Sequence, residues 1–267
     1  MKQDKTMFFK RNETLPFIEM RQANLSTACY HSHSHDEFSF GVIDSGSAQY
    51  KNLNNINTVG QGDTVFINPG DVHSCNPDLK DWSYRMLFID THWIGPLQSE
   101  MTNTDSYDYL PFSDVLSSSK IAYQQFSALF SSLMSEKNPL ILESMLISYL
   151  QQHFLIKKQE KIDPVNIRKV KTLLSDEINI NHSLDDLVQE SGLSRFHLIR
   201  SFKQTYGLSP HAYQLDERIK KAKNLLKSGH SIIEISHLLG FADQSHLQRN
   251  FKKRLAVTPK QYQGFFI

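Results

Sequence analysis

The chain reads SLDDLVQESGLSRFHLIRSFKQTYGLSPHAYQLDERIKKAKNLL at residues 183–226 and SIIEISHLLGFADQSHLQRNFKKRLAVTPKQYQ at residues 231–263. The second stretch repeats the pattern of the first. Gly192 recurs as Gly240 at an offset of 48, and five further residues recur at an offset of 49: Leu198 as Leu247, Arg200 as Arg249, Phe202 as Phe251, Pro210 as Pro259 and Tyr213 as Tyr262. The change of offset indicates one inserted residue in the second turn. Each copy predicts a short helix, a turn at glycine and a second helix, which is a helix-turn-helix unit.

The second helix of the first copy is expected to expose one polar face. Ser194 precedes this helix as an N-cap, and Leu198 and Phe202 point inward. The residues left for the outside are Arg195, Phe196, His197, Ile199 and Arg200. Arginine donates two hydrogen bonds to guanine, and the amino end of a helix attracts phosphate. The pattern therefore predicts a helix that enters the major groove of DNA.

The second copy repeats this arrangement with different residues on the outward face of its second helix. Leu247 and Phe251 point inward, and the residues expected outside are Gln244, Ser245, His246, Gln248 and Arg249. Between the copies, Ser209 and Gly229 bound a predicted helix of roughly 18 residues, or about 27 Å. This length separates the two recognition helices by about one turn of DNA. A single chain is therefore expected to read two successive major-groove segments.

These two stretches resemble the DNA-binding domain of AraC/XylS-type transcription regulators. The resemblance implies base contacts from Phe196, Ile199 and Arg200 in the first unit, and from the five outward residues in the second. The sequence departs from the family pattern at two positions. Ala256 stands where the family usually has the glycine that ends the second recognition helix, and Ile199 stands where a polar base reader is common.

The first half of the chain has a residue pattern typical of antiparallel strands. Between Phe38 and Asp90, the runs FSFGVI, TVFINP and YRMLFID alternate with turn-forming residues. Helical spacing starts at Phe112. We expect an α+β protein with a cupin-like antiparallel β-barrel at residues 1–111, a helical linker at 112–160, and an all-α domain of two helix-turn-helix units joined by a long helix at 161–267.

A histidine-rich segment marks the candidate sensor site. HSHSHDEFSFGVIDSG and GDTVFINPGDVHSCNP resemble the two motifs of cupins, in which histidines and a glutamate bind a metal. Strand alternation would place His31, His33, His35 and Glu37 on one face, with His73 approaching it. Two registers fit the motif: one keeps the glycine spacing and replaces the glutamate by Ser39, and the other keeps Glu37 and shifts the glycine.

Three interpretations of this segment stay open. The favoured one is an effector pocket without a cofactor, made by His33, His35, Glu37 and His73 with Tyr84 and Met86 as walls. The second is a site for zinc or another transition metal, with candidate ligands His31, His33, His35, Glu37 and His73. The third is hydrogen-bonded core histidines around an empty barrel. The residues do not distinguish an amino-acid effector from a sugar.

Charge and hydropathy narrow the class of protein. Residues 162–267 hold 16 Lys and Arg against 10 Asp and Glu, whereas residues 1–161 hold 13 against 18. A basic carboxy-terminal part favours a polyanionic partner. No window approaches 18 uninterrupted apolar residues, and the first residues, MKQDKTMFFK, lack the apolar run of a secretory signal. We therefore expect a cytoplasmic protein that does not span a membrane.

Together these patterns predict a sequence-specific transcription regulator, an activator and not an enzyme, that binds double-stranded DNA, a small-molecule effector and RNA polymerase. A homodimer is expected through residues 112–158, because their apolar side chains exceed what one barrel face needs: Phe126, Phe130, Leu133, Ile141, Met145 and Tyr149. Two alternatives are a cupin metalloenzyme fused to a DNA-binding domain, and an architectural DNA-bending protein without an effector.

Overall fold

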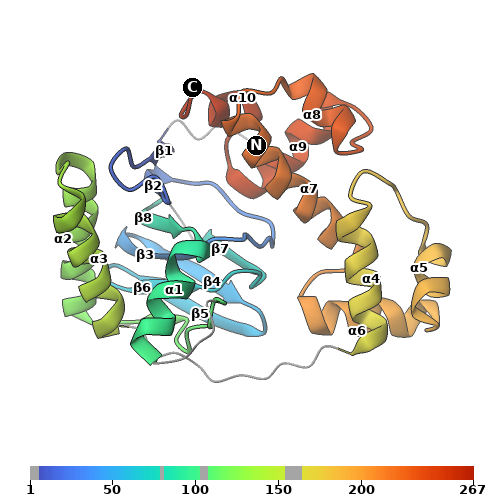
Figure 1. Ribbon diagram of the computed structural model, residues 1–267, viewed down its shortest axis with the longest axis horizontal. Coiled ribbons are helices and arrows are strands. Elements are labelled where there is room, and N and C mark those ends of the chain that lie inside the picture. Colours follow the sequence, from blue (N-terminus) through green and yellow to red (C-terminus); the bar gives the residue numbers. More distant parts are fainter. Residues whose placement is uncertain (1–5, 79–80, 103–107, 154–163) are drawn as a thin grey trace. The chain divides into compact units, whose positions relative to one another are not determined.

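The computed structural model describes residues 6–78, 81–102, 108–153 and 164–267, and it divides the chain into two units (Figure 1). The first unit comprises residues 1–29, 35–69 and 75–159. The second comprises residues 160–267 and two short segments from earlier in the chain, 30–34 and 70–74. The predicted boundary between linker and DNA-binding domain, at residues 160/161, lies outside the described residues.

The first unit contains two antiparallel sheets, except that His73 and Ser74 at the start of β7 belong to the second unit. Its strands are β1 (Phe8–Arg11), β2 (Ile18–Ser26), β3 (Phe38–Ser45), β4 (Ser47–Asn52), β5 (Asn55–Gly60), β6 (Thr64–Ile67), β7 (His73–Pro77), β8 (Trp82–Ile89) and β9 (Leu116–Ser117). The larger sheet has the order β1-β2-β8-β3-β6-β9, and the smaller one β5-β4-β7. Tyr50 on β4 donates a hydrogen bond to the carbonyl of Phe66 on β6 at 2.7 Å, so the two sheets are linked through the interior.

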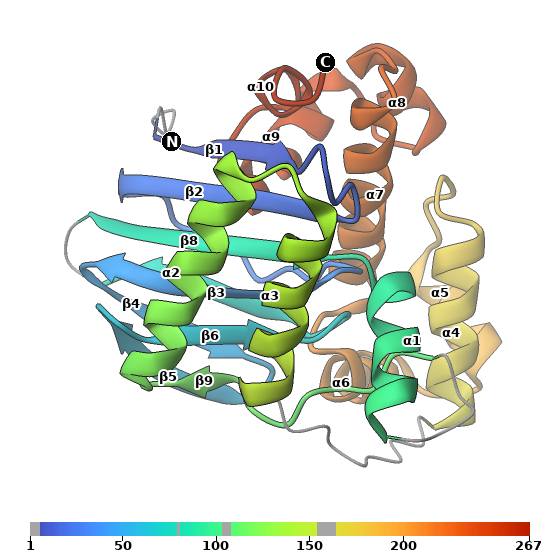
Figure 2. The ribbon, with the colours of Figure 1, turned by 60° about the vertical axis from the view of Figure 1, so that its left-hand side comes forward.

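Helices cover one face of the larger sheet. The first unit has α1 (Thr91–Thr102), α2 (Lys120–Ser135) and α3 (Pro139–His153), and Figure 2 shows α2 and α3 in front of the strands. Phe40 on β3 stacks on Tyr149 of α3 and meets Phe126 of α2 edge-on. Alternate residues of β2, β3 and β8 complete this core: Ile18, Met20, Phe38, Val42, Leu87 and Ile89. The sheet therefore supplies one apolar face and the two helices supply its cover.

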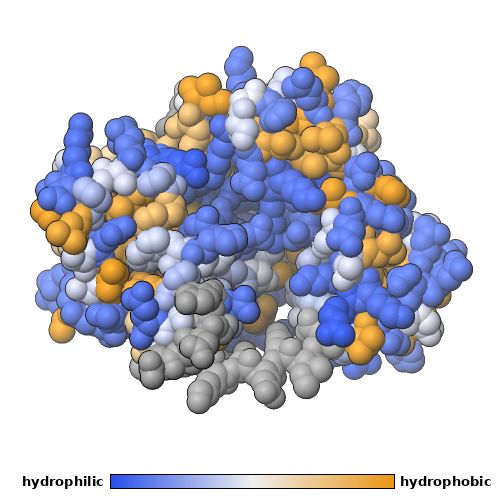
Figure 3. Space-filling model, viewed as in Figure 1, coloured by the Kyte–Doolittle hydropathy of each residue, from blue (hydrophilic) through white to orange (hydrophobic). Residues whose placement is uncertain are grey.

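This packing corrects the apolar surplus expected for the linker helices. Phe126, Phe130, Leu133 and Tyr149 are buried against the sheet, because its face of large aromatic and aliphatic residues needs all of them. Of the six predicted residues, Ile141 is exposed and Met145 is partly buried. The further large apolar side chains exposed on α2 and α3 are Ile121, Met134 and Leu140. Figure 3 shows a largely hydrophilic surface on which hydrophobic residues gather in small patches, including one over the region of α8.

The second unit is helical. Its helices are α4 (Val165–Asp176), α5 (Leu184–Ser191), α6 (Arg195–Tyr206), α7 (Pro210–Lys227), α8 (Ile232–Leu238), α9 (Gln244–Leu255) and α10 (Pro259–Gln263). Side-chain caps fix their starts. Ser183 and Ser231 form capping boxes on α5 and α8, and Ser209 caps α7 with Pro210 in the first helical position. Helices α5–α6 and α8–α9 are the two predicted helix-turn-helix units, and α7 joins them.

Each helix-turn-helix unit has an apolar centre of its own. In the first, Leu198 and Phe202 of α6 pack with Val170 of α4 and Leu187 of α5. In the second, Leu247 and Phe251 of α9 are buried, and the Phe251 ring meets Tyr262 of α10. The inward residues predicted from the repeat are thus confirmed in both copies. Within the described residues, no helix combines the length and the apolar character needed to cross a membrane.

Candidate DNA-binding interface and sensor interior

The first recognition helix, α6, presents the predicted outer face to solvent. Ser194 caps it by accepting a hydrogen bond from the backbone of His197. Because Leu198 and Phe202 are buried beneath, the side chains of Arg195, His197, Ile199 and Arg200 are exposed. The side chain of Phe196 lies outside the described residues. The exposed set offers two guanidinium groups and one apolar surface near the amino end of the helix, which suits phosphate contact and base readout.

Arg195 differs from Arg200 in having an acidic neighbour. Its Nε and Nη2 both donate to Asp185 Oδ1 of α5, at 2.9 and 2.6 Å. Both side chains are about two-thirds exposed, so water screens this ion pair and it adds little to stability. The pair turns the Arg195 guanidinium toward Asp185 of α5. Arg200 is therefore the stronger candidate for a direct base contact from α6.

The second recognition helix, α9, is more closely covered by its own turn. Asp243 caps it, Ser245 and Arg249 are exposed, and Gln244, His246 and Gln248 are half-buried. The His246 ring meets the edge of Phe241 at a centroid distance of 5.5 Å. Burial and the nearby Arg249 lower the pKa of His246. Phe241, which directly follows the turn glycine Gly240, therefore lies against the start of the helix.

The helix ends show the effect of the expected departure at Ala256. Gly207 ends α6 with a left-handed φ of 76°. Ala256, at the equivalent position after α9, adopts the same region with φ 62°, although its Cβ disfavours this conformation. The second copy thus ends its recognition helix in the same left-handed conformation as the first, with alanine in place of glycine.

The histidine-rich segment does not form the continuous strand that sequence alternation predicts. The chain bends at residues 32 and 36–37, and only His33 takes part in a β-bridge, with His73. The rings turn back to the backbone: His33 Nδ1 lies 2.8 Å from the carbonyl oxygen of His31, and His35 Nδ1 lies 2.7 Å from that of Glu37. The expectation that His31, His33, His35 and Glu37 share one face is therefore wrong.

The structure assigns the predicted sensor residues to both units. His35, Glu37, Tyr84 and Met86 belong to the first unit. His31, His33 and His73 lie in the two segments that belong to the second unit, where the rings of His33 and His73 lie 4.4 Å apart. Among the described residues, no group of three or more His, Cys, Asp or Glu side chains is arranged to bind a metal ion.

The interior of the first unit carries polar groups that the sequence patterns did not single out. Strand pairing places residues of β2, β8 and β3 in three rows opposite the helix-covered face: Glu19, Phe88 and Ser39; Arg21, Met86 and Gly41; Ala23, Tyr84 and Ile43. We call this the interior face. The buried His35 ring joins it, 3.1 Å from the Ser39 hydroxyl and edge-on to Phe88. Tyr84 and Met86, predicted as pocket walls, lie on this face.

Arg21 is the main group that sequence reasoning missed. Its side chain is buried, and its guanidinium lies over the rings of Phe9 and Tyr84 at 5.1 and 5.5 Å. Burial raises the pKa of the Cys75 thiol on β7, and the Arg21 charge opposes that rise, so the cation lies near the smaller sheet. The alternation of apolar and polar residues at Ile18, Glu19, Met20 and Arg21 could have predicted this strand, with Glu19 and Arg21 on one face.

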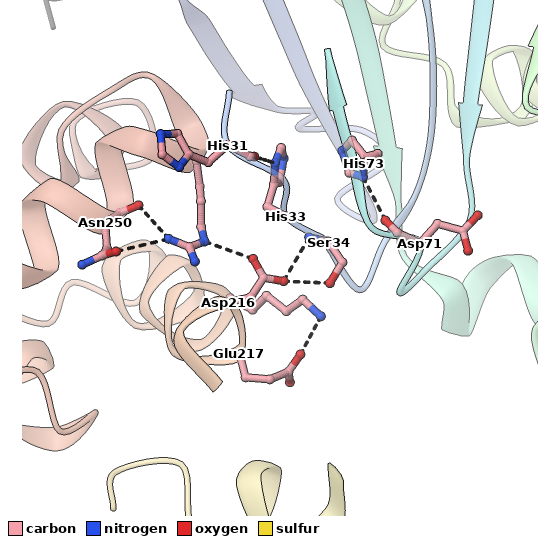
Figure 4. A network of polar contacts seen from close by, with 10 residues as sticks. His31, His33, Ser34, Asp71, His73, Asp216, Glu217 and Asn250 are labelled. Atoms are coloured by element: carbon pink, nitrogen blue, oxygen red, sulfur yellow. Dashed lines mark hydrogen bonds and ion pairs between the residues drawn. The ribbon is translucent and has the colours of Figure 1, made fainter. Parts of the chain in front are cut away.

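A network of hydrogen bonds surrounds the buried Asp216 in the second unit (Figure 4). Asp216 of α7 accepts hydrogen bonds from the backbone N and the hydroxyl of Ser34, at 3.0 and 2.7 Å. Its other oxygen accepts one from Arg254 of α9 at 3.2 Å. The backbone N of His31 donates to the carbonyl of Lys253 at 3.1 Å. Segment 30–34 is therefore an integral part of the second unit.

Two family models match the parts of the chain described above. Residues 18–150 match the AraC-like ligand binding domain, and residues 187–264 match a helix-turn-helix domain. The chain belongs to the AraC family of transcription regulators. The first match covers strands β2 to β9, helices α1 and α2 and most of α3 of this AraC-family protein, and the second covers both recognition helices.

Similar proteins span most of the length of this AraC-family chain. The HTH-type transcriptional regulator YbfI of Bacillus subtilis is 29% identical over 229 residues, which is 81% of this chain and 80% of YbfI. The HTH-type transcriptional activator RhaS of Klebsiella pneumoniae is 24% identical, covering 96% and 94% of the two chains. A crystal structure of apo ToxT from Vibrio cholerae matches the fold with a TM-score of 0.63 at 17% identity, over 97% of this chain and all of that one. The protein is accordingly a sequence-specific DNA-binding transcription regulator.

Proposed function

We propose that this protein is an effector-controlled transcription activator that acts without a metal cofactor and without catalysing a reaction. The observation that carries the proposal is the repeated presentation of a basic helix face. Arg200 and Arg249 are exposed at the same position of the two copies, whereas the residues on the opposite side of each helix are buried. Two such helices on one α7 give a chain that recognises double-stranded DNA at two places.

The interior face supports an effector site in the first unit. Glu19, Arg21 and His35 are buried there beside Tyr84, Met86 and Phe88. Ligand sites combine an apolar lining with a few polar groups that fix orientation. Carboxylate, guanidinium, imidazole and hydroxyl groups together suit a small polar effector such as an amino acid or a sugar. Glu37, His33 and His73 remain proposed members of the effector-responsive region.

The course of the chain supports a route from effector to DNA-binding helices. Ser34 is hydrogen-bonded to Asp216 within the second unit, and the next residue, His35, is hydrogen-bonded to Ser39 within the first. An effector that displaces the His35 ring would pull on Ser34. An effector changes DNA binding only by as much as it prefers one of the two states, typically about 1 to 3 kcal/mol.

We further propose that the protein forms a homodimer, contacts RNA polymerase and acts in the cytoplasm. Ile121, Met134, Leu140 and Ile141 on α2 and α3 are large apolar side chains open to solvent, which supports a homodimer through these helices. An activator role is supported by the name of the relative RhaS and entails contact with RNA polymerase. We place the protein in the cytoplasm, where promoter DNA and polymerase are found.

The test is a reporter assay with a promoter that carries a DNA site selected by the purified protein, across a panel of amino acids and sugars. His35→Ala and Glu37→Ala are expected to abolish the response to the active effector and to leave binding to the selected site intact. His92→Ala, at an exposed position of the same unit, is the control and should respond like the parent. Identical induction curves for the parent and both variants would refute the effector site.

A further inference from the structure

Arg218 lies in the middle of α7 and is one of the largest fully buried side chains of the described residues. Its guanidinium donates four hydrogen bonds, to the carbonyl oxygens of Ile178 at 2.6 Å, Gly240 at 2.8 Å and Ile180 at 3.2 Å, and to Asn181 Oδ1 at 2.9 Å. A planar guanidinium can serve several acceptors at fixed angles, which an ammonium group cannot. The three nitrogens of the Arg218 guanidinium are thus hydrogen-bonded to four acceptors.

These acceptors come from both helix-turn-helix halves of the domain. Ile178, Ile180 and Asn181 follow α4, which packs in the core of the first unit of the repeat. Gly240 belongs to the turn between α8 and α9 in the second. The accepting carbonyls follow the carboxy-terminal ends of α4 and α8, where the helix dipole favours a positive charge. One buried cation therefore connects the segment after α4, which packs on the first copy, with the turn of the second copy.

The two turns also abut directly. A Cβ atom placed on Gly240 would lie 2.0 Å from the carbonyl oxygen of Asn179, a distance that real atoms do not adopt. Gln214, one turn of α7 before Arg218, donates to the carbonyl of Ile180 at 2.7 Å and so fixes the same turn a second time. Residues 178–181, Gly240 and Arg218 thus form one close-packed contact, here called the inter-repeat clamp.

The equivalent glycine of the first copy lacks this contact. Gly192 has φ +66°, almost identical to the +67° of Gly240, yet a Cβ placed on Gly192 would meet no atom within 4 Å. Both glycines satisfy the same backbone requirement of the turn. Only Gly240 has, in addition, to let another backbone approach. The second requirement concerns the relation between the two copies and not the fold of either one.

We infer that Arg218 is a positioning residue for DNA recognition: through the inter-repeat clamp it fixes the separation and the rotational phase of α6 and α9. A chain fixed in this way reads its two DNA subsites at one spacing only. One base pair of insertion rotates the second subsite by about 34° and moves it by about 3.4 Å. A protein that holds α6 and α9 rigidly cannot adjust to this change. A protein in which the two helices move relative to each other can adjust, but its second helix then meets its subsite at a lower effective concentration.

The experiment uses the full chain and a duplex selected by the parent protein from a randomised 30-base-pair library. Binding is measured at one fixed salt concentration, on the selected duplex and on duplexes with one base pair inserted or removed between the two protected segments. For the parent, the altered spacing is expected to weaken binding about 30-fold. For Arg218→Lys, binding to the selected duplex falls about tenfold, and the penalty for altered spacing falls to about threefold or less.

Gly240→Ala and Gly192→Ala form a matched pair because both substitutions strain the same left-handed turn conformation. Gly240→Ala is expected to reduce the spacing penalty as Arg218→Lys does, and Gly192→Ala to retain it. Circular dichroism establishes whether each variant is folded. If Arg218→Lys melts below the assay temperature, the comparison of Gly240→Ala with Gly192→Ala tests the inference instead. A spacing penalty equal to that of the parent in folded Arg218→Lys or in folded Gly240→Ala overturns the inference.

Discussion

The two helix-turn-helix units share one pattern and present it differently. In the first, the start of α6 is open to solvent, and Arg195 is paired with Asp185. In the second, the Phe241 ring lies against His246, and three of the five residues on α9 predicted to contact bases are half-buried. A repeated motif can thus give an exposed, basic reading helix in one copy and a partly covered, more polar one in the other. The repeated apolar residues give both copies the same buried core, whereas the turn before each recognition helix affects which side chains are exposed at its start.

The largest expected effect comes from removing the shared arginine of each copy. Arg200→Ala and Arg249→Ala should each weaken binding to the selected DNA by about 1 to 3 kcal/mol, with Arg200→Ala the larger because Ile199 leaves α6 with fewer polar readers. Arg195→Ala is the control and should cost less, since Asp185 already engages that side chain. Titrations at matched salt measure all three. Parent-like affinity in both Arg200→Ala and Arg249→Ala would mean that the recognition helices are wrongly assigned.

A smaller effect is expected where the copies differ at the helix end. Gly207→Ala should lower the free energy of unfolding by about 1 to 2 kcal/mol, because the new Cβ disfavours a positive φ and would lie 2.8 Å from Val72 Cβ. Ala256→Gly should change it by less than about 1 kcal/mol. Relief of backbone strain is offset by the lost contact of a buried methyl group and by the greater freedom of glycine in the unfolded chain.

Chemical denaturation of both variants beside the parent tests this asymmetry. The result that counts against it is a gain well above 1 kcal/mol for Ala256→Gly, because the second copy would then carry real strain that its packing does not offset. An unchanged stability of Gly207→Ala would show that the first copy tolerates alanine equally well, and the two helix ends would be equivalent.

The smallest expected effect is a pH dependence that belongs to the second copy. The pKa of His246 is lowered by burial and by the positive charges of Arg249, Arg218 and His211, while Asp243 acts against them. The folded chain therefore binds this proton less readily than the unfolded chain does. Its contribution to stability is complete above the ordinary histidine pKa of about 6.5 and is lost as the pH falls through and below that value.

His246→Gln should accordingly reduce the fall in melting temperature between pH 7.5 and pH 5. The matched variant is His197→Gln, at the equivalent position of the exposed first copy. Thermal melts of the parent and both variants at each pH supply the comparison. An identical fall in the parent and His246→Gln would show that burial and the neighbouring charges do not lower the pKa of His246 enough to affect stability.

The parts of the fold that follow from local rules were predictable from the sequence. Caps such as Ser194 and Ser209, the turn glycine Gly192 and the apolar spacing of Leu198 and Phe202 define helices through neighbours only a few residues away. The inserted turn residue and the departure at Ala256 were visible in the repeat itself. The exposure of the outer face followed directly from the burial of the inner one.

Other features depend on partners distant in the sequence and were missed or misjudged. Strand β2 was missed because Glu19 and Arg21 obscure its apolar pattern, although both side chains are buried. Helix α1 was missed because it contains Gly95 and Pro96, residues that usually interrupt helices. Residue alternation predicts a strand for the histidine segment, but its hydrogen bond from Ser34 to Asp216 spans 182 residues. No local pattern predicts such a contact.

The most direct test of the central claim is base-resolved footprinting of the full chain on its selected duplex. Two recognition helices on one α7 predict two protected major-groove segments per bound chain, about 10 base pairs apart on one face of the DNA. Arg200→Ala should weaken protection of one segment and Arg249→Ala protection of the other. A single protected segment, or two segments that respond alike to both substitutions, would contradict the conclusion that each chain reads DNA through both copies of the repeat.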